Sequence, residues 1–316
     1  MQGAQDSPPG GRYSLSEVAT RCYRMPLAWP EAFSPISCPA CCSEKFHVVA
    51  FELVFRIVKC AACGHIYLNP VPDEAYVAAY NSSKISDALG YQEAWLSTRS
   101  PAARWIARWC RKRFRKGGSV ADIGTGFGDL LLLFDPHVWR RSGVELSPAV
   151  AAEANKALGE GTVRVGDAAT VELPRGQYDV VCLVNVIEHL ASPDRVLANI
   201  RPSLAPGGVL LVRWPQLLFL YTLQSLAGRS FPGIQAPCHL HDFRRRSIER
   251  LLARCGYSVV RHYVVNNMDA LKRRGTALRC AMRSIDLSSR FANWISLGRR
   301  CAPWGSVVTV AGLSRS

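Results

Sequence analysis

The sequence predicts an α/β protein with a doubly wound parallel sheet, preceded by a small metal-binding domain. Two observations in the 316-residue chain lead to this fold class. A short apolar stretch at 120–123 runs into a glycine-rich turn, and an apolar segment that reads as a helix follows at 129–134. This strand–turn–helix order is typical of nucleotide-binding sheets. In addition, two Cys-x2-Cys pairs stand near the N-terminus, separated by 18 residues.

The N-terminal part divides into a leader and a ribbon. Residues 1–30 carry Pro8-Pro9-Gly10-Gly11 and little periodicity, so we expect a flexible leader. Within 31–72, two apolar stretches between the cysteine pairs read as the strands of a zinc ribbon. Four thiolates fill a tetrahedral site, which predicts a structural Zn²⁺ that stabilises a domain too small to fold alone. Free or disulfide-bonded thiols are the alternative. The predicted ligands are Cys38, Cys41, Cys60 and Cys63.

A helical linker is expected over residues 73–116. Its second half, from Pro101 onward, has apolar residues on one face and ends in the basic cluster 111–116. Such a cluster with aromatic neighbours can contact nucleic acid or an anionic membrane surface. A solvated face whose long side chains snorkel is an equal alternative.

The glycine turn carries the strongest functional signal. Three glycines in 124–128 leave alternate backbone positions without a Cβ, so a ligand can lie directly against the turn. The next strand, at 142–144, ends at Glu145, which stands 23 residues after Asp122. An acidic residue at about this spacing, at the end of the second strand, can accept hydrogen bonds from both hydroxyls of a ribose. Asp122 precedes the turn, where a carboxylate repels a pyrophosphate but pairs with a cationic amino-acid group. The pattern therefore favours S-adenosylmethionine over NAD.

From this point the chain resembles the class I S-adenosylmethionine-dependent methyltransferase family. Four stretches match the family's motifs in order, namely 120–129, 166–168 after a third strand, 178–190, and 204–212. The resemblance implies a Rossmann-like, doubly wound sheet of seven strands over residues 117–316. The join Cys-Gly-x2-Tyr-x-Asn-Pro-x-Pro at 63–72 is similar to that of a bacterial group found in glycan and surface-polysaccharide pathways, and to sugar C-methyltransferases.

The resemblance also implies which residues hold the cofactor. The turn would contact the methionine part, Glu145 the ribose, and the motif at 166–168 the adenine. The full set is Asp122, Gly124, Thr125, Gly126, Glu145, Leu146, Asp167, Ala168 and Asn185. Glu188 and His189 match part of a Glu-x-x-Glu-His pattern linked to a divalent cation in ubiquinone-pathway O-methyltransferases. Because Asn185 replaces the first Glu, we expect a hydrogen-bonded pocket wall rather than a cation site.

The segment 237–243 resembles the part of the family in which a histidine faces the substrate. We therefore expect His239 to be the general base, with His241 as the second candidate, because a neutral imidazole suits deprotonation of a hydroxyl near pH 7. A histidine that only bridges loops is the alternative. Lid or insertion segments are expected at about 214–240 and 268–300, where apolar or basic residues would pack on the sheet or meet a lipid-linked substrate.

The net charge of +15 favours anionic partners without choosing among them. No stretch near the N-terminus combines the features of a secretion signal, so we expect a cytoplasmic protein, with peripheral membrane contact left open. The predicted function is methyl transfer from S-adenosylmethionine to a hydroxyl of a sugar, glycan or lipid-linked intermediate. An RNA methyltransferase and a catalytically silent zinc-ribbon adaptor are the alternatives, with nucleic acid the less favoured partner.

Overall fold

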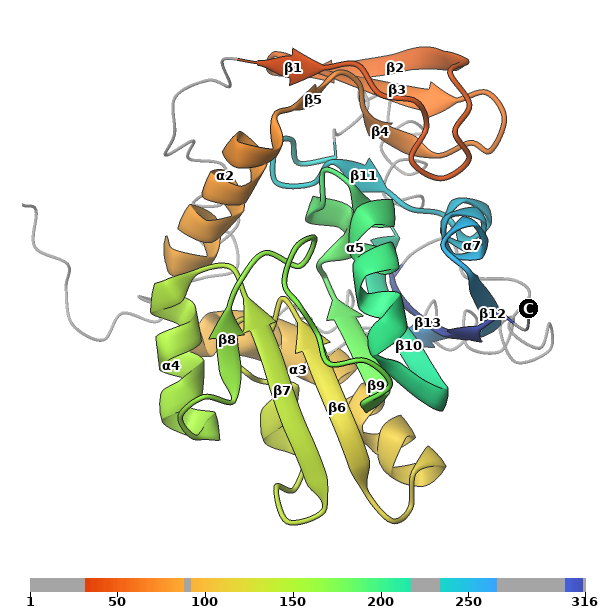
Figure 1. Cartoon of the computed structure of the whole chain (residues 1–316). Helices are drawn as coiled ribbons and strands as arrows, with labels where there is room; N and C mark the ends of the chain where they lie inside the picture. The colour runs from red at the N-terminus through yellow and green to blue at the C-terminus, as the bar shows by residue number, and fades with distance from the viewer. Residues whose placement is uncertain (1–31, 88–91, 217–233, 266–304, 315–316) are drawn as a thin grey trace, which may run out of the picture.

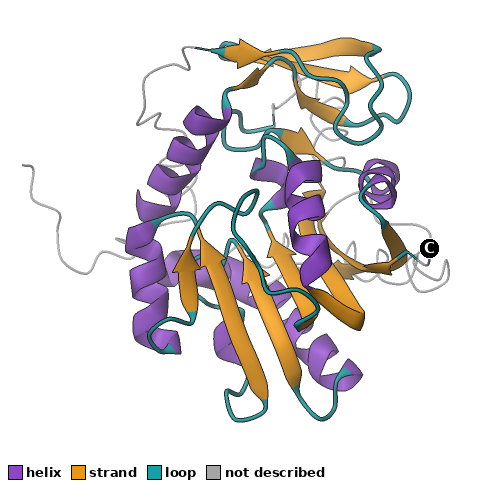
Figure 2. Cartoon of the chain, viewed as in Figure 1, coloured by secondary structure: helices purple, strands orange, loops and turns teal. Residues whose placement is uncertain are grey.

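The computed structural model describes residues 32–87, 92–216, 234–265 and 305–314. A central sheet with helices on both faces forms the larger part, and a small all-β ribbon lies at its upper end in Figure 1. Figure 2 shows helices around the large sheet and strands joined by loops in the ribbon. The predicted leader, most of the predicted lid and the whole predicted insertion at 268–300 lie outside the described residues.

The central sheet has seven strands in the order β12-β13-β10-β9-β6-β7-β8. Strand β13 is antiparallel to both of its neighbours, whereas β10, β9, β6, β7 and β8 pair in parallel. This arrangement confirms the predicted seven-stranded, doubly wound fold class. The strands are β6 Gly118–Ile123, β7 Trp139–Glu145, β8 Val163–Val165, β9 Tyr178–Val184, β10 Leu204–Gln216, β12 Tyr257–Val265 and β13 Gly305–Leu313.

Both faces of this sheet are buried, which explains why its central strands read as continuous apolar runs. Val120 and Val180 pack with one hydrophobic cluster, and the next residues, Ala121 and Val181, pack with another. The first cluster contains residues of α3 and α4, the second residues of α5 and α7. The helices are α2 Glu74–Asp87, α3 Gln92–Arg113, α4 Pro148–Leu158, α5 Pro193–Ile200 and α7 Arg245–Arg254. In the described part of the chain, none of the helices is both long and apolar enough to cross a membrane.

The prediction of an α-helix at 129–134, directly behind the glycine turn, is wrong. Gly128 has φ of 83°, and the chain then makes only the 3₁₀ turn η2, Leu131–Leu133. Pro136 follows three residues later and disfavours a helical conformation of the residue before it. The space between the left-handed glycine and the proline therefore admits one short turn rather than an α-helix.

The ribbon obtains one of its strands from a distant part of the chain. Its four-stranded sheet has the order β11-β4-β3-β2, in which β11 comes after the central strands of the large domain. His241 pairs with Tyr67 and Asp242 with Ile66. A separate two-stranded sheet joins β1 to β5. The bounds are β1 Phe33–Ser34, β2 Phe46–Glu52, β3 Phe55–Cys60, β4 Ile66–Leu68, β5 Val71–Pro72 and β11 His241–Asp242.

Leu240 provides a test of this shared sheet. Its side chain is fully buried in a cluster with Phe55 and Ile57 of the ribbon. Replacement by alanine, Leu240→Ala, removes buried methyl groups and leaves a cavity, so we expect the free energy of unfolding to fall by about 2–5 kcal/mol. Urea unfolding measures this change. Leu132→Ala deletes the same atoms from a side chain that is 46% exposed, and its effect should stay within about 0.5 kcal/mol. Equal effects of the two variants would contradict the packing described.

Candidate active site

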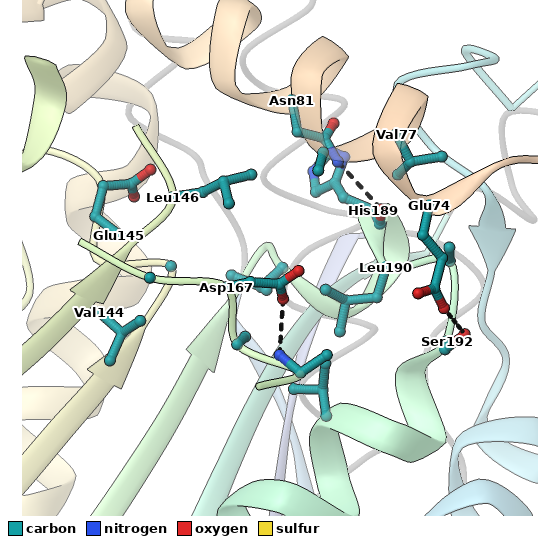
Figure 3. A pocket seen from close by; sticks show the side chains of 18 of the residues that line it. Glu74, Val77, Asn81, Val144, Glu145, Leu146, Asp167, His189, Leu190 and Ser192 are labelled. Atoms are coloured by element: carbon teal, nitrogen blue, oxygen red, sulfur yellow. Dashed lines mark hydrogen bonds between the residues drawn. The ribbon is translucent and has the colours of Figure 1, made fainter. Parts of the chain in front are cut away.

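A cavity of about 200 Å³ lies at the carboxyl ends of β6, β7, β8 and β9. This is the edge at which open α/β sheets bind their ligands. Figure 3 shows Glu145 and Leu146 on one side of the cavity and His189 on the other, with Asn81 of α2 above. The cavity therefore joins the glycine-turn region to the residues that follow β9.

The glycine turn is held in one shape by its own hydrogen bonds. The backbone N–H groups of Gly124 and Thr125 both donate to the Val144 carbonyl oxygen, at 2.8 and 3.0 Å. Gly124 has φ of 71°, and a Cβ added there would lie 2.4 Å from a methyl carbon of Val186. A side chain at this position would be strained and would clash, so glycine is required. The bare backbone of Gly124 and Gly126 lines the cavity, as predicted for a close cofactor contact.

Glu145 is fixed by two backbone donors. Its Oε2 accepts from the N–H of Gly126 at 2.8 Å, and its Oε1 accepts from the N–H of Ser147 at 3.0 Å. The side chain lines the cavity and is 5% exposed. Each carboxylate oxygen retains a second lone pair. The residue can therefore accept a pair of hydroxyl groups from a ribose while remaining bound to the turn.

The other predicted cofactor residues occupy two positions. Leu146, Asp167 and Ala168 line the cavity, and Asp167 Oδ1 accepts from the Ala169 N–H at 2.8 Å (Figure 3). Asp122 and Thr125 are buried behind the turn at 2% and 1% exposure, and neither belongs to the lining. The Thr125 hydroxyl donates to the Asp122 carbonyl oxygen at 2.6 Å, which ties the strand end to the turn.

Asn185 has two features that are typical of a ligand-binding residue. It lines the cavity with φ of 56°, a conformation uncommon outside glycine. Its backbone N–H donates to the Arg213 carbonyl oxygen at 3.0 Å. Its buried Oδ1 accepts no hydrogen bond from the described residues. A buried acceptor without a donor is costly, so a bound cofactor with a polar N–H group would fit here.

The two predicted histidines lie in different surroundings. His241 is 2% exposed, and its Nε2 donates to the Leu190 carbonyl oxygen at 2.8 Å, so its Nδ1 accepts from His65 Nε2 at 3.3 Å. It does not line the cavity. His239 does not line the cavity either, but its ring lies 4.7 Å from that of His189, which does. Burial, together with the charge of His189, lowers the pKa of His239 to about 4, so its imidazole is neutral near pH 7.

Residues of α2 and of the loop after β10 form parts of the cavity that the sequence analysis missed. Glu74, Asn81 and Cys238 all line it. Asn81 Nδ2 donates to the His189 carbonyl oxygen at 3.2 Å. The Ser192 hydroxyl and the guanidinium of Arg195 hold the pKa of Glu74 below its usual range. No local pattern in the linker marks Glu74 and Asn81, because their partners lie more than 100 positions away.

The four ribbon cysteines come together as predicted. Their sulfur atoms all lie within 4.8 Å of one another, with 3.5 Å between Cys38 and Cys63 and 3.6 Å between Cys41 and Cys60. Zn–S bonds of about 2.3 Å in a tetrahedron place sulfurs about 3.8 Å apart. The donor set and its spacing therefore fit a closed four-thiolate zinc site.

The fold and the cavity define a class I S-adenosylmethionine-dependent methyltransferase. A family model described as a methyltransferase domain matches residues 95–262, which is more than half of the chain. The chain belongs to this family. The predicted family and enzyme class are thus confirmed, with S-adenosylmethionine as the cofactor.

The individual relatives compared below share less than 30% sequence identity with this chain. The Mycolicibacterium smegmatis protein named "Probable S-adenosylmethionine-dependent methyltransferase" is 25% identical over 190 residues, 60% of this chain and 69% of its own. A Streptomyces venezuelae enzyme, dTDP-3-amino-3,4,6-trideoxy-alpha-D-glucopyranose N,N-dimethyltransferase, is 29% identical over 34% of this chain and 46% of its own. A Coxiella burnetii ubiquinone biosynthesis O-methyltransferase is 23% identical over 40% of this chain and 56% of its own. The chain thus spans about half the length of the latter two.

A solved structure shares the fold. Magnesium protoporphyrin IX methyltransferase from Synechocystis, solved with bound SAH, superposes with a TM-score of 0.51 at 18% identity. The match covers 77% of this chain and all of the other. At this level of identity the likeness concerns the fold alone.

Glu145→Gln tests the ribose contact. The amide keeps the shape of the side chain but cannot accept from both backbone donors and from hydroxyl groups as a carboxylate does. Because a hydrogen bond to a charged group contributes about 1.5–3 kcal/mol, we expect the Kd for S-adenosylmethionine to rise about 10- to 100-fold. Calorimetric titration gives the Kd. Glu153→Gln, which changes an acid paired on the surface with Lys156, is the control and should bind as the parent does. An unchanged Kd in Glu145→Gln would refute the assignment.

A glycine pair tests the close approach at the turn. Gly124 and Gly161 both have positive φ, 71° and 76°, but an added Cβ at Gly161 would meet nothing within 4 Å. Gly161→Ala should therefore cost only the backbone strain, about 1–2 kcal/mol of unfolding free energy. Gly124→Ala adds the clash with Val186, about 1–3 kcal/mol more, and should also weaken cofactor binding. Chemical unfolding and calorimetry of both variants distinguish the two effects, and equal behaviour would show that nothing packs closely at Gly124.

Proposed function

We propose that the protein transfers a methyl group from S-adenosylmethionine to a hydroxyl of a small-molecule acceptor such as a sugar, a glycan or a lipid-linked intermediate. The observation that carries the proposal is the set of residues that line the two ends of the cavity. One end is lined by Glu145 and the glycine turn, and the other by His189, whose ring contacts the neutral imidazole of His239. One relative is named as a dTDP-sugar N,N-dimethyltransferase and another as a ubiquinone biosynthesis O-methyltransferase, which supports a small acceptor.

Seven of the nine cofactor residues predicted from the sequence line the cavity, and the cofactor is assigned to them. Glu145 would bind the ribose, Asp167 and Ala168 the adenine, and the backbone of Gly124 and Gly126 the methionine part. Asn185 would place its buried Oδ1 toward a donor group of the cofactor. Asp122 and Thr125 would support the turn from behind, and Leu146 would pack beside the ribose.

The cofactor, when bound, supplies a methyl group that is already activated for in-line displacement. The contribution of the chain is therefore mainly positioning, together with removal of the acceptor's proton. That proton would leave toward the imidazoles at the His189 end of the cavity. His239 remains the proposed base, because its ring is neutral near pH 7 and contacts the ring of His189, which lines the cavity. His241 is the weaker candidate, because both of its ring nitrogens hold structural hydrogen bonds.

The ribbon has a structural part in this proposal. We assign a Zn²⁺ ion to Cys38, Cys41, Cys60 and Cys63, supported by the sulfur spacing. The side chains of α7 donate to carbonyl oxygens of the two cysteine loops, Arg254 to Pro39 at 2.5 Å and Arg250 to Ala62 at 3.2 Å. The zinc would therefore stabilise the ribbon and, through β11, the wall of the cavity.

Transfer of a labelled methyl group to a panel of acceptors tests the function. We expect label in nucleotide-linked sugars or quinol precursors with a free hydroxyl, and His239→Asn should lower the rate at pH 7 about 10²- to 10⁴-fold. Because the folded-state pKa of His239 is about 4, its base form persists at higher pH. The parent rate should thus be flat between pH 6 and 8 and fall only as the pH approaches 4.

His137→Asn alters an exposed histidine outside the cavity and should keep the parent rate. In His239→Asn the deficit should shrink as the pH rises, because the acceptor hydroxyl then loses its proton more readily to solvent. Label that enters only amines or RNA would exclude a hydroxyl acceptor. A rate in His239→Asn equal to that of the control would exclude His239 as the base.

A further inference from the structure

A second cluster of metal-ligating side chains lies beside the cavity, apart from the ribbon cysteines. It consists of His189, Cys238 and His239, and one ligand atom of each lies within 4.8 Å of the others. His189 ends the short 3₁₀ turn η3, Ile187–His189, which follows β9, whereas the other two precede β11. Two of the three line the cavity. The cluster is therefore assembled by the tertiary fold and stands at the proposed acceptor end.

The backbone that carries the cluster is anchored on both sides. The Leu240 N–H donates to the Glu188 carbonyl oxygen at 2.8 Å, which fixes the loop directly to η3. At the start of the loop, Glu52 Oε2 of the ribbon accepts from the N–H groups of Ile234 and Gln235 at 2.9 and 3.1 Å. The two parts of the cluster are thus held at a set distance by the fold, as a metal site requires.

The ring of His189 is held in place by Cys238. Its Nδ1 lies 2.5 Å from the Cys238 carbonyl oxygen and, since a carbonyl only accepts, Nδ1 must donate. The lone pair of the neutral ring is then on Nε2. A backbone carbonyl that accepts from one ring nitrogen fixes the tautomer and the orientation of the ring, as at many protein metal sites. The Sγ of Cys238 lies 3.8 Å from the same Nδ1.

Charges of both signs lie near the cluster: the buried guanidinium of Arg213 acts on His239, and a buried carboxylate lies beside His189. Glu188 is 2% exposed, and its Oε1 lies 3.9 Å from His189 Nε2. A thiolate at Cys238 and this buried carboxylate together would balance the two positive charges of a divalent ion. Two imidazoles and one thiolate form a donor set that binds zinc and its neighbours in the first transition series.

We infer that His189, Cys238 and His239 bind a second divalent transition-metal ion of the zinc class, separate from the ion assigned to the ribbon. Three protein ligands are the number found at catalytic zinc sites, where the fourth position takes water or substrate. At the edge of the cavity such an ion would bind the acceptor hydroxyl and lower its pKa, so that the hydroxyl proton would leave to water and His239 would be a ligand instead of the base. This role rests on the proposed function, but binding of the ion does not.

Metal content of the full-length protein tests the inference. Zinc-loaded protein, passed through a desalting column, should contain one zinc ion for each of the two clusters when measured by inductively coupled plasma mass spectrometry. Cys238→Ser and His239→Asn should each lose one ion and keep the other. Cys255→Ser removes a partly buried thiol outside both clusters and should retain both ions. Retention of the ribbon zinc in the variants shows that they are folded.

Cobalt provides an independent readout of the thiolate. After a weak chelator removes the more labile ion, one equivalent of Co²⁺ should give a thiolate-to-cobalt absorption band in the parent and in Cys255→Ser. The band should be absent in Cys238→Ser. One zinc per chain in the parent with no cobalt band would overturn the inference, as would two ions that persist in both Cys238→Ser and His239→Asn. Either result leaves the methyltransferase proposal intact, since that is judged by transfer of the labelled methyl group.

Discussion

The backbone of Leu240 connects the two halves of the molecule. Its N–H donates to Glu188 beside the cavity, and its carbonyl oxygen accepts from the N–H of Leu68 in the ribbon at 2.9 Å. The next two residues form β11 and complete the ribbon sheet. Separation of the ribbon from the cavity wall would leave these buried backbone groups unpaired, which is costly, so the junction joins the two parts. The ribbon is thereby joined to the part of the cavity wall that carries His189.

The cofactor end depends on a different constraint, a carboxylate bound to backbone. Glu145 links the end of β7 to the glycine turn after β6 through Gly126. Because both parts of the turn also bond to Val144, the two strand ends form one rigid unit. A preorganised site of this kind loses little freedom when a ligand binds. Asn185 lines the same cavity as this rigid unit and His189.

Much of this arrangement could be predicted from local patterns in the sequence. The apolar runs, the glycine spacing and the position of Glu145 relative to Asp122 all lie within short segments, and they predicted the sheet and its binding edge. The prediction of a helix behind the turn was wrong, because the left-handed Gly128 and the residue before Pro136 leave room for only one short turn between them. The pairing of β11 with β4 and the approach of Cys238 to His189 join residues far apart in the chain. No periodicity marks such contacts, so they became visible only in the folded structure.

The origin of β11 also affects the order in which the protein can form during synthesis. The ribbon leaves the ribosome early, but its sheet cannot be completed until Asp242 has been made, after most of the large domain. Until then the edge of β4 that later pairs with β11 has unpaired backbone groups, which can pair with a strand of another chain. Domains usually fold as units from the N-terminus onward. Here the ribbon is made before the large domain, but its sheet is completed only after most of that domain has been made.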